Sequence, residues 1–218
     1  MNRITLRGGL LPFLLSVCAA GCSSPPPLPA GSGLRAADQT PPEGIELYER
    51  PNWTAGDELI YQRGERATLS FVVEPVGDGW GLRDAGSDRQ TVLDANLGLL
   101  GERRIDAERF DVEVDPYDPA YSWPLWVGKR WTGEFTMRDT ATGEEVMFVA
   151  RYHCEAGETI TVPAGTFETL RIWRRDAIAG QDDLLQHSTV VWYAPEVGYM
   201  VRRLSGSLET VLTEHLKQ

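Results

Sequence analysis

The chain has 218 residues, of which 42% are hydrophobic and 24% charged, and its formal net charge is -11 at pH 7. An acidic excess of this size argues against binding to nucleic acid, which depends on clustered lysine and arginine, and against electrostatic adhesion to anionic lipid. Such a surface instead favours solubility or the binding of cationic partners.

The first 21 residues have the three parts of a secretory signal. Arg3 and Arg7 precede an apolar run of about eleven residues, Leu10–Ala20, and small residues follow at its end. A membrane-spanning helix needs roughly 20 apolar residues. The segment therefore predicts export and not a retained transmembrane helix.

The signal closes with Ala19-Ala20-Gly21-Cys22, which resembles the lipobox of bacterial lipoprotein precursors. The resemblance implies that Cys22 is linked to diacylglycerol, carries fatty chains such as palmitate, and becomes the first mature residue. Cys18 matches less well, because a valine precedes it where the motif takes Gly, Ala or Ser. Two or three acyl chains hold a protein at a bilayer almost permanently, at about 0.8 kcal/mol per buried methylene.

The residues around the cut site also bear on sorting and on an alternative route. Ser23 is not the aspartate associated with inner-membrane retention, so we expect an outer-membrane lipoprotein that faces the periplasm. Ordinary signal peptidase could instead recognise Ala19-x-Gly21, leaving a soluble periplasmic protein with Cys22 as a free thiol. A disulfide from Cys22 to Cys154 then becomes conceivable, whereas acylation leaves Cys154 as the single free thiol.

Composition divides the exported chain into a tether and one domain. Residues 22–43 contain six prolines with Gly, Ser and Ala between them, which predicts a semi-extended tether reaching at most ~60 Å at about 3.1 Å per residue. Residues 44–218 have the size of a single domain that buries roughly 70% of its unfolded surface. The expected order is a signal peptide (1–21), a tether with lipidated Cys22 (22–43) and a β-sheet domain (44–218).

Apolar and polar residues alternate through this domain, with glycine and proline between the runs, and helical periodicity is hard to find. Around Gly143, two alternating runs predict a hairpin. Pro163-Ala164-Gly165 predicts a second chain reversal, because proline presets φ and glycine fits a left-handed corner. The expected strands, in chain order, are 57–62, 67–76, 105–115, 131–138, 146–152, 160–162, 167–174, two strands flanking 195–198, and 208–216.

About nine to eleven strands are expected in all, and residues 93–109 are ambiguous between a loop, a strand pair and one short helix. A sheet of that many strands rarely stays flat and open. The predicted fold is therefore all-β, with a single antiparallel sheet curled into a barrel or half-barrel and little helix.

Three segments resemble, in this order, a family of bacterial envelope proteins of unknown function: "PLWVGKRW" (124–131), "ITVPAGTFETLRI" (160–172) and "WYAPEVGYMVRR" (192–203). The resemblance covers roughly the last hundred residues. It implies an exported β-sheet domain, often signal-bearing or lipidated, whose sheet bends into a barrel or half-barrel. It implies no reaction, and it provides no catalytic residues to transfer.

Aromatic residues gather between positions 117 and 131 and form the strongest candidate for ligand binding. Trp123, Trp126 and Trp131 could stack against a glycan or close an apolar cavity. The alternative, which is the commoner fate of such residues, is that they fill the core or pack at its rim.

Asp111, Glu113 and Asp115 form the most suggestive acidic feature. In a strand they would share one face at about 6.8 Å spacing, which makes them a weak calcium candidate, although a solvated strand face explains the same pattern. The three histidines lack zinc spacing, and there is no nucleophile elbow or P-loop. We therefore expect no other metal, no cofactor and no enzymatic activity.

Three functions are compatible with these features. The first is an envelope lipoprotein whose periplasmic domain acts by binding or assembly, with the membrane and an envelope protein as its contacts. The second is a carrier that holds a lipid or other apolar ligand in a half-barrel cup. The third is a glycan-directed enzyme that uses Asp111, Glu113 and Asp115, which would require two facing carboxyl groups in a cleft.

Overall fold

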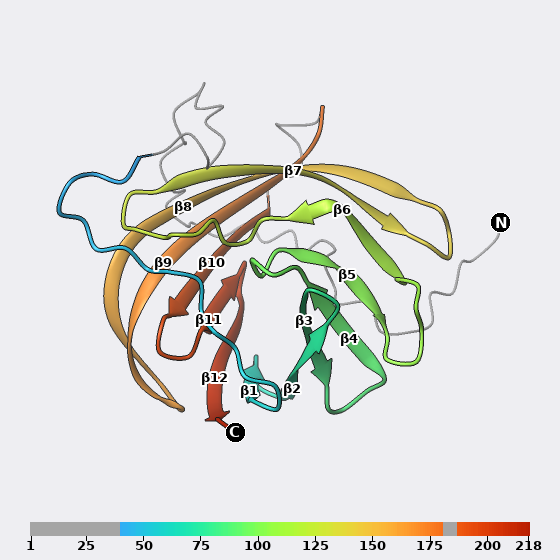
Figure 1. Ribbon diagram of the computed structural model, residues 1–218, viewed down its shortest axis with the longest axis horizontal. Coiled ribbons are helices and arrows are strands. Elements are labelled where there is room, and N and C mark those ends of the chain that lie inside the picture. The colour runs from blue at the N-terminus through green and yellow to red at the C-terminus, as the bar shows by residue number, and fades with distance from the viewer. Residues whose placement is uncertain (1–39, 181–186) are drawn as a thin grey trace. The chain divides into compact units, whose positions relative to one another are not determined.

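Strands follow one another along the chain, and each pairs with the next in an antiparallel register (Figure 1). The computed structural model describes residues 40–180 and 187–218. Their 12 strands form one closed barrel, in the order β1-β12-β11-β10-β9-β8-β7-β6-β5-β4-β3-β2. The strands are β1 (Glu58–Arg63), β2 (Ala67–Val76), β3 (Gly79–Asp84), β4 (Arg89–Leu93), β5 (Leu99–Arg104), β6 (Val112–Asp118), β7 (Arg130–Asp139), β8 (Glu145–Val162), β9 (Gly165–Ile178), β10 (His187–Ala194), β11 (Tyr199–Ser205) and β12 (Leu208–Leu216).

The barrel closes because the first strand pairs with the last as well as with the second. Tyr61 of β1 lies opposite Leu212 of β12 and also opposite Leu69 of β2. The predicted all-β fold is confirmed. Of the two predicted shapes, a barrel and a half-barrel, the sheet forms the closed barrel. Closure leaves neither terminal strand with an unpaired edge, which removes a site of unwanted strand addition.

The described residues hold one strand more than the upper end of the expected range. Two strands, β3 and β4, were not expected, whereas the expected strands 146–152 and 160–162 are one continuous strand, β8. The sequences of β3 and β4, "GWGLRD" and "RQTVL", are short, and glycines interrupt the alternation in the first. A Cβ at Gly79 would lie 2.1 Å from the Leu93 carbonyl oxygen, so this close approach of two strands requires glycine. Packing, and not local pattern, therefore defines these strands.

The segment predicted as one strand over 105–115 is divided in the structure. Residues 105–111 form a loop that begins with a turn, and β6 begins only at Val112. In the ambiguous stretch 93–109, a turn over 94–98 is followed by the strand β5. No helix forms there, because both segments find partners in the sheet.

The predicted chain reversals are confirmed. Trp131 lies opposite Tyr152 in the β7–β8 hairpin, and Val162 lies opposite Gly165 across the tight β8–β9 turn. The corner at residues 195–198 joins β10 to β11. These reversals depend on local turn chemistry, which is why the sequence predicts them.

The segment before β1, blue in Figure 1, is attached to one end of the barrel. Tyr48 and Leu125 exchange two backbone hydrogen bonds of 2.9 and 2.8 Å. Trp53 Nε1 donates to the carbonyl oxygen of Gly198 at 3.0 Å. We call this the aromatic end; it contains the β2–β3, β4–β5, β6–β7, β8–β9 and β10–β11 connections.

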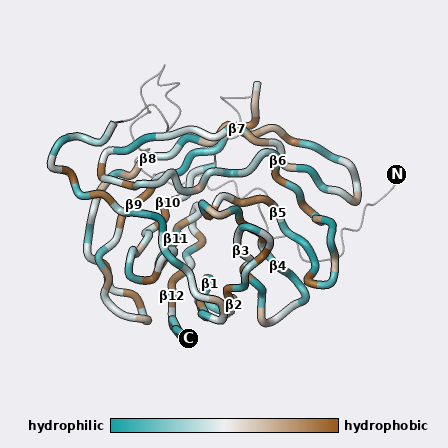
Figure 2. Tube along the Cα trace, in the orientation of Figure 1, coloured by the Kyte–Doolittle hydropathy of each residue, from teal (hydrophilic) through white to brown (hydrophobic). Residues whose placement is uncertain are grey.

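Side chains from the strands pack into one hydrophobic core cluster inside the barrel. Figure 2 shows how hydropathy changes between neighbouring residues along the strands. Trp131 and Tyr152, each 1% exposed, stack in the lumen with ring centroids 5.1 Å apart. Across residues 40–180 and 187–218, no helix has the length and apolar character needed to cross a bilayer.

Candidate functional site

The β4–β5 turn at the aromatic end is held in an unusual conformation. Asp94 Oδ1 accepts hydrogen bonds from the backbone N–H groups of Asn96 and Gly98, at 2.8 and 2.7 Å. Leu97 has a φ of 65°, the left-handed region that a branched side chain rarely adopts. Such a residue costs about 1–3 kcal/mol, which is offset here because the Leu97 side chain is 2% exposed in the core.

Two long side chains hold this turn from different parts of the chain. Arg50 Nη1 donates to the Ala95 carbonyl oxygen at 2.7 Å. Trp123 Nε1 donates to the carbonyl oxygen of the next residue, Asn96, at 2.9 Å. The turn is thus tied to the segment before β1 on one side and to the β6–β7 loop on the other.

A cleft of about 250 Å³ opens between the segment before β1, the β2–β3 turn and the β4–β5 turn. The Trp53 and Trp80 rings both line it and meet edge to face, with centroids 5.8 Å apart at an interplanar angle of 64°. Trp53 is buried and Trp80 is half-buried. The residues that line the cleft include Arg50, Asn52, Trp53, Asp78, Trp80 and Ala95.

Behind the cleft, aromatic rings form a continuous packed cluster. Tyr199 contacts Trp53 at 5.4 Å and Tyr121 at 6.3 Å between ring centroids. Tyr121 stacks on Trp123 at 5.4 Å, and Tyr193 meets both of these rings. Burial raises the pKa of the Tyr121 hydroxyl well above its usual range. The cluster therefore forms a rigid, uncharged support for the end of the barrel.

The three tryptophans predicted as a ligand platform occupy different environments. Trp123 is half-buried at the aromatic end. Trp126 is 4% exposed, and the ammonium group of Lys129 lies 4.3 Å from its ring centroid. Trp131 is in the lumen, where its Nε1 donates to the Pro119 carbonyl oxygen. The structure therefore leaves Trp123 near the cleft and places the other two in the core.

An ion network crosses the lumen between β6 and β9. Arg174 contacts Asp118 through Nη1 at 2.5 Å and Asp176 through Nε at 2.7 Å. The two carboxylate side chains are only 3% and 7% exposed. Tyr152 donates its hydroxyl proton to Asp118, and the Arg174 guanidinium lies 5.5 Å from the Tyr152 ring centroid. Burial raises the pKa of Asp176, while the adjacent guanidinium opposes that rise.

His187 and Ser205 form a hydrogen-bonded pair near the other end of the barrel. His187 Nε2 lies 2.6 Å from Ser205 Oγ, and Asp176 is opposite His187 in the β9–β10 register. Both Asp176 carboxylate oxygens accept hydrogen bonds from Arg174 Nε. This arrangement makes Asp176 part of the ion network.

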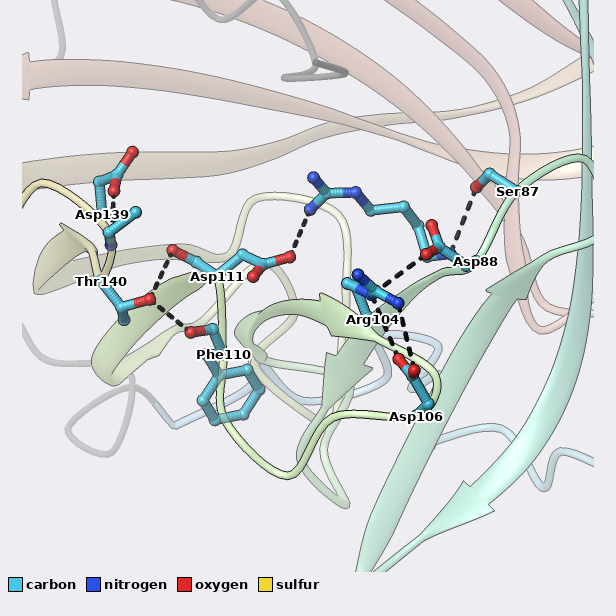
Figure 3. Close-up of polar contacts among 10 residues, drawn as sticks. Ser87, Asp88, Arg104, Asp106, Phe110, Asp111, Asp139 and Thr140 are labelled. Atoms are coloured by element: carbon cyan, nitrogen blue, oxygen red, sulfur yellow. Dashed lines mark hydrogen bonds and ion pairs between the residues drawn. The ribbon is translucent and has the colours of Figure 1, made fainter. Parts of the chain in front are cut away.

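The predicted acidic residues also lie apart from the aromatic end. Asp111 precedes β6 and is ion-paired with Arg89 at 2.8 Å. Figure 3 shows Asp111 beside Thr140, whose hydroxyl donates to the Asp111 backbone carbonyl oxygen. Glu113 pairs with Arg138 at 2.9 Å, and Asp115 is exposed. Within residues 40–180 and 187–218, no three His, Cys, Asp or Glu side chains are grouped to hold a metal ion.

Sequence reasoning did not identify the Arg174 network or the cleft. A signal for the network was present, because Arg174 and Asp176 continue the inward series that begins with Leu170 and Ile172 in β9. Opposite charges at two consecutive inward positions of a strand indicate a buried ion pair. The cleft had no comparable local signal, since its residues come from three separated segments.

Comparison with known proteins leaves the family unassigned. No protein-family profile and no curated protein matches the chain. The hypothetical lipoprotein YmcC from Escherichia coli (K12) aligns with a TM-score of 0.48 and 12% identity, over 76% of this chain and 90% of its own. A protein named as a lipoprotein from Parabacteroides distasonis aligns with a TM-score of 0.46 and 13% identity, over 78% of this chain and 100% of its own. A protein named as exported, with a YmcC-like fold, from Bacteroides fragilis aligns with a TM-score of 0.46 and 15% identity, over 78% of this chain and 100% of its own.

Proposed function

We propose that the chain is an exported lipoprotein of the cell envelope whose β-barrel acts by binding and not by catalysis. The observation that carries the binding role is the filled lumen. Trp131 and Tyr152 stack there, and Arg174 spans it between two buried carboxylates. A ligand therefore meets the barrel at its ends or on its outer surface.

The filled lumen also bears on the two alternative functions. A carrier of apolar ligands needs an enclosed apolar space, whereas here stacked rings and an ion network occupy the lumen. A glycan-directed enzyme needs two carboxyl groups that flank the scissile bond. Asp111 and Glu113 are each engaged by an arginine, at 2.8 and 2.9 Å, which favours a structural role for both.

The proposed location rests on the residues that close the signal. Cys22 follows Ala19-Ala20-Gly21 at the position where lipoprotein precursors are acylated. Acyl chains would hold the protein in the outer membrane, and the proline-rich tether would place the barrel in the periplasm. These N-terminal residues lie outside the described part of the chain.

Metabolic labelling with palmitate tests this proposal. We expect wild-type protein to be labelled and to fractionate with the outer membrane, whereas Cys22→Ala should be unlabelled and released by osmotic shock. Cys154→Ala is the matched control, because Cys154 is completely buried in the barrel and should not affect labelling. Unlabelled, soluble wild-type protein would refute the anchor and leave the soluble periplasmic alternative.

A further inference from the structure

We propose that the cleft lined by Trp53 and Trp80 binds one ring of a neutral saccharide. This inference rests on the proposed binding function of the barrel, and it names the site and the class of ligand.

The size of the cleft limits the ligand to about one ring. Its volume is about 250 Å³. Pockets for drug-sized molecules are roughly 300–1,000 Å³. A ligand larger than one ring must therefore extend out of the cleft over the neighbouring surface.

The lining combines an aromatic face with hydrogen-bonding side chains. A sugar ring is amphipathic, because its C–H groups form apolar faces while its hydroxyl groups project from the edge. The half-buried Trp80 ring provides an apolar surface, and Asn52 and Asp78 provide exposed amide and carboxylate groups beside it. Together these groups can contact the face of a sugar and accept from or donate to its hydroxyls.

The charges on the cleft favour a neutral ligand. Arg50 and Asp78 both line it, so their formal charges cancel. An anion or a cation would be attracted by one of these side chains and repelled by the other. A purely apolar ligand would remove the same polar groups from water without replacing their hydrogen bonds, which is unfavourable.

Two walls of the cleft are held in place before any ligand arrives. Trp53 is fixed by its hydrogen bond to the Gly198 carbonyl oxygen at 3.0 Å. Arg50 is fixed by its hydrogen bond to the Ala95 carbonyl oxygen at 2.7 Å. Because these side chains are already ordered, binding loses less conformational entropy than it would at a flexible surface.

Aromatic side chains continue on the other side of the β4–β5 turn. Trp123 donates to the Asn96 carbonyl oxygen at 2.9 Å. Tyr117, which is 39% exposed, packs so closely on Gly98 that a Cβ there would lie 2.6 Å from the tyrosine ring. This second aromatic surface is where further rings of an oligosaccharide would extend, so a trisaccharide should bind more tightly than a single sugar.

The direct test is titration of the full chain, purified in a detergent without a sugar headgroup. The probes are N-acetylglucosamine, its β-1,4-linked trimer and maltotriose, measured by isothermal titration calorimetry and saturation-transfer NMR. Purified peptidoglycan sacculi and phosphatidylethanolamine vesicles with or without lipooligosaccharide distinguish cell-wall glycan from glycolipid as the source of the ring. We expect at least one trisaccharide to bind and to receive saturation from aromatic protons of the protein.

Variants assign the binding to the cleft. Trp80→Ala should weaken the association constant about tenfold, the effect of losing one aromatic stacking contact. Trp80 also packs on the core, so its substitution could weaken binding through the fold. Asp78→Ala is therefore the second variant, because Asp78 is an exposed turn residue whose side chain can be truncated without unfolding the barrel. Its saccharide binding should weaken severalfold. Asp106→Ala is the matched control, because Asp106 is an exposed turn acid that does not line the cleft and lies beside Arg104 (Figure 3), so this variant should bind like wild type.

The outcomes separate this inference from the proposed function. If folded wild-type protein binds none of the probes, or if Asp78→Ala binds as tightly as wild type, the saccharide cleft is refuted while palmitate labelling is unaffected. If labelling fails but the probes bind at Trp80 and Asp78, the cleft stands and the membrane anchor is wrong.

Discussion

The buried ion network gives the strongest test of how the barrel is stabilised. Arg174 neutralises two carboxylates that are 3% and 7% exposed. Arg174→Met keeps most of the apolar stem but leaves Asp118 and Asp176 buried without their shared cation. Breaking a buried pair by removing one partner costs about 3–5 kcal/mol, so we expect a loss of that size in the free energy of unfolding at pH 7.

The same variant should show a defined pH dependence. Burial raises the pKa of Asp176 in the folded wild type, and without the guanidinium that pKa rises further. A carboxyl group with a raised pKa in the folded state destabilises the fold as pH rises through that pKa, and this penalty disappears once the group is protonated in both states. The difference between wild type and Arg174→Met should therefore be largest at pH 7 and smaller near about pH 4.

Urea denaturation followed by tryptophan fluorescence measures both effects through linear extrapolation. Arg138→Met is the matched control, because its side chain is 48% exposed and pairs with Glu113 at the surface, where an ion pair contributes about 0–1 kcal/mol. Adding Asp118→Asn and Asp176→Asn to Arg174→Met should recover part of the stability, since no buried charge then lacks a partner. A loss below about 1 kcal/mol at pH 7, or an equal loss at both pH values, would refute the reasoning.

The remaining predictions concern single buried positions. Burial raises the pKa of the Cys154 thiol to about 12, so iodoacetamide should fail to modify it in folded protein and react in urea; rapid modification of native protein would contradict this. Gly133→Ala should destabilise the barrel by about 1–3 kcal/mol in urea melts, because the new Cβ would lie 2.5 Å from the Pro119 ring. Burial lowers the pKa of Lys129 to about 8, so above that pH the unfolded chain binds more protons than the folded one. The free energy of unfolding should therefore rise with pH up to the ordinary lysine pKa. Lys129→Met should lack this rise in the same urea melts, and a variant with the same pH profile as wild type would contradict the prediction.

The sequence by itself determined the features that depend on neighbouring residues. Alternation in β7 and β8 predicted their hairpin, and Pro163-Ala164-Gly165 predicted the turn between β8 and β9. Each is a local property, since strand period and turn geometry involve only a few consecutive residues. The short strands β3 and β4 were missed because glycines break the alternation in β3 and packing alone defines the pair.

Only the tertiary structure decided how the barrel closes and what surrounds its functional groups. Pairing of β1 with β12 joins the two ends of the domain, and no local pattern encodes that contact. Arg174 meets Asp118 because strands far apart in sequence face the same lumen. The cleft likewise needs Arg50, Trp80 and Ala95 from three separate segments. Such sites arise from the summed twist and register of many strands, which become defined only when the sheet closes.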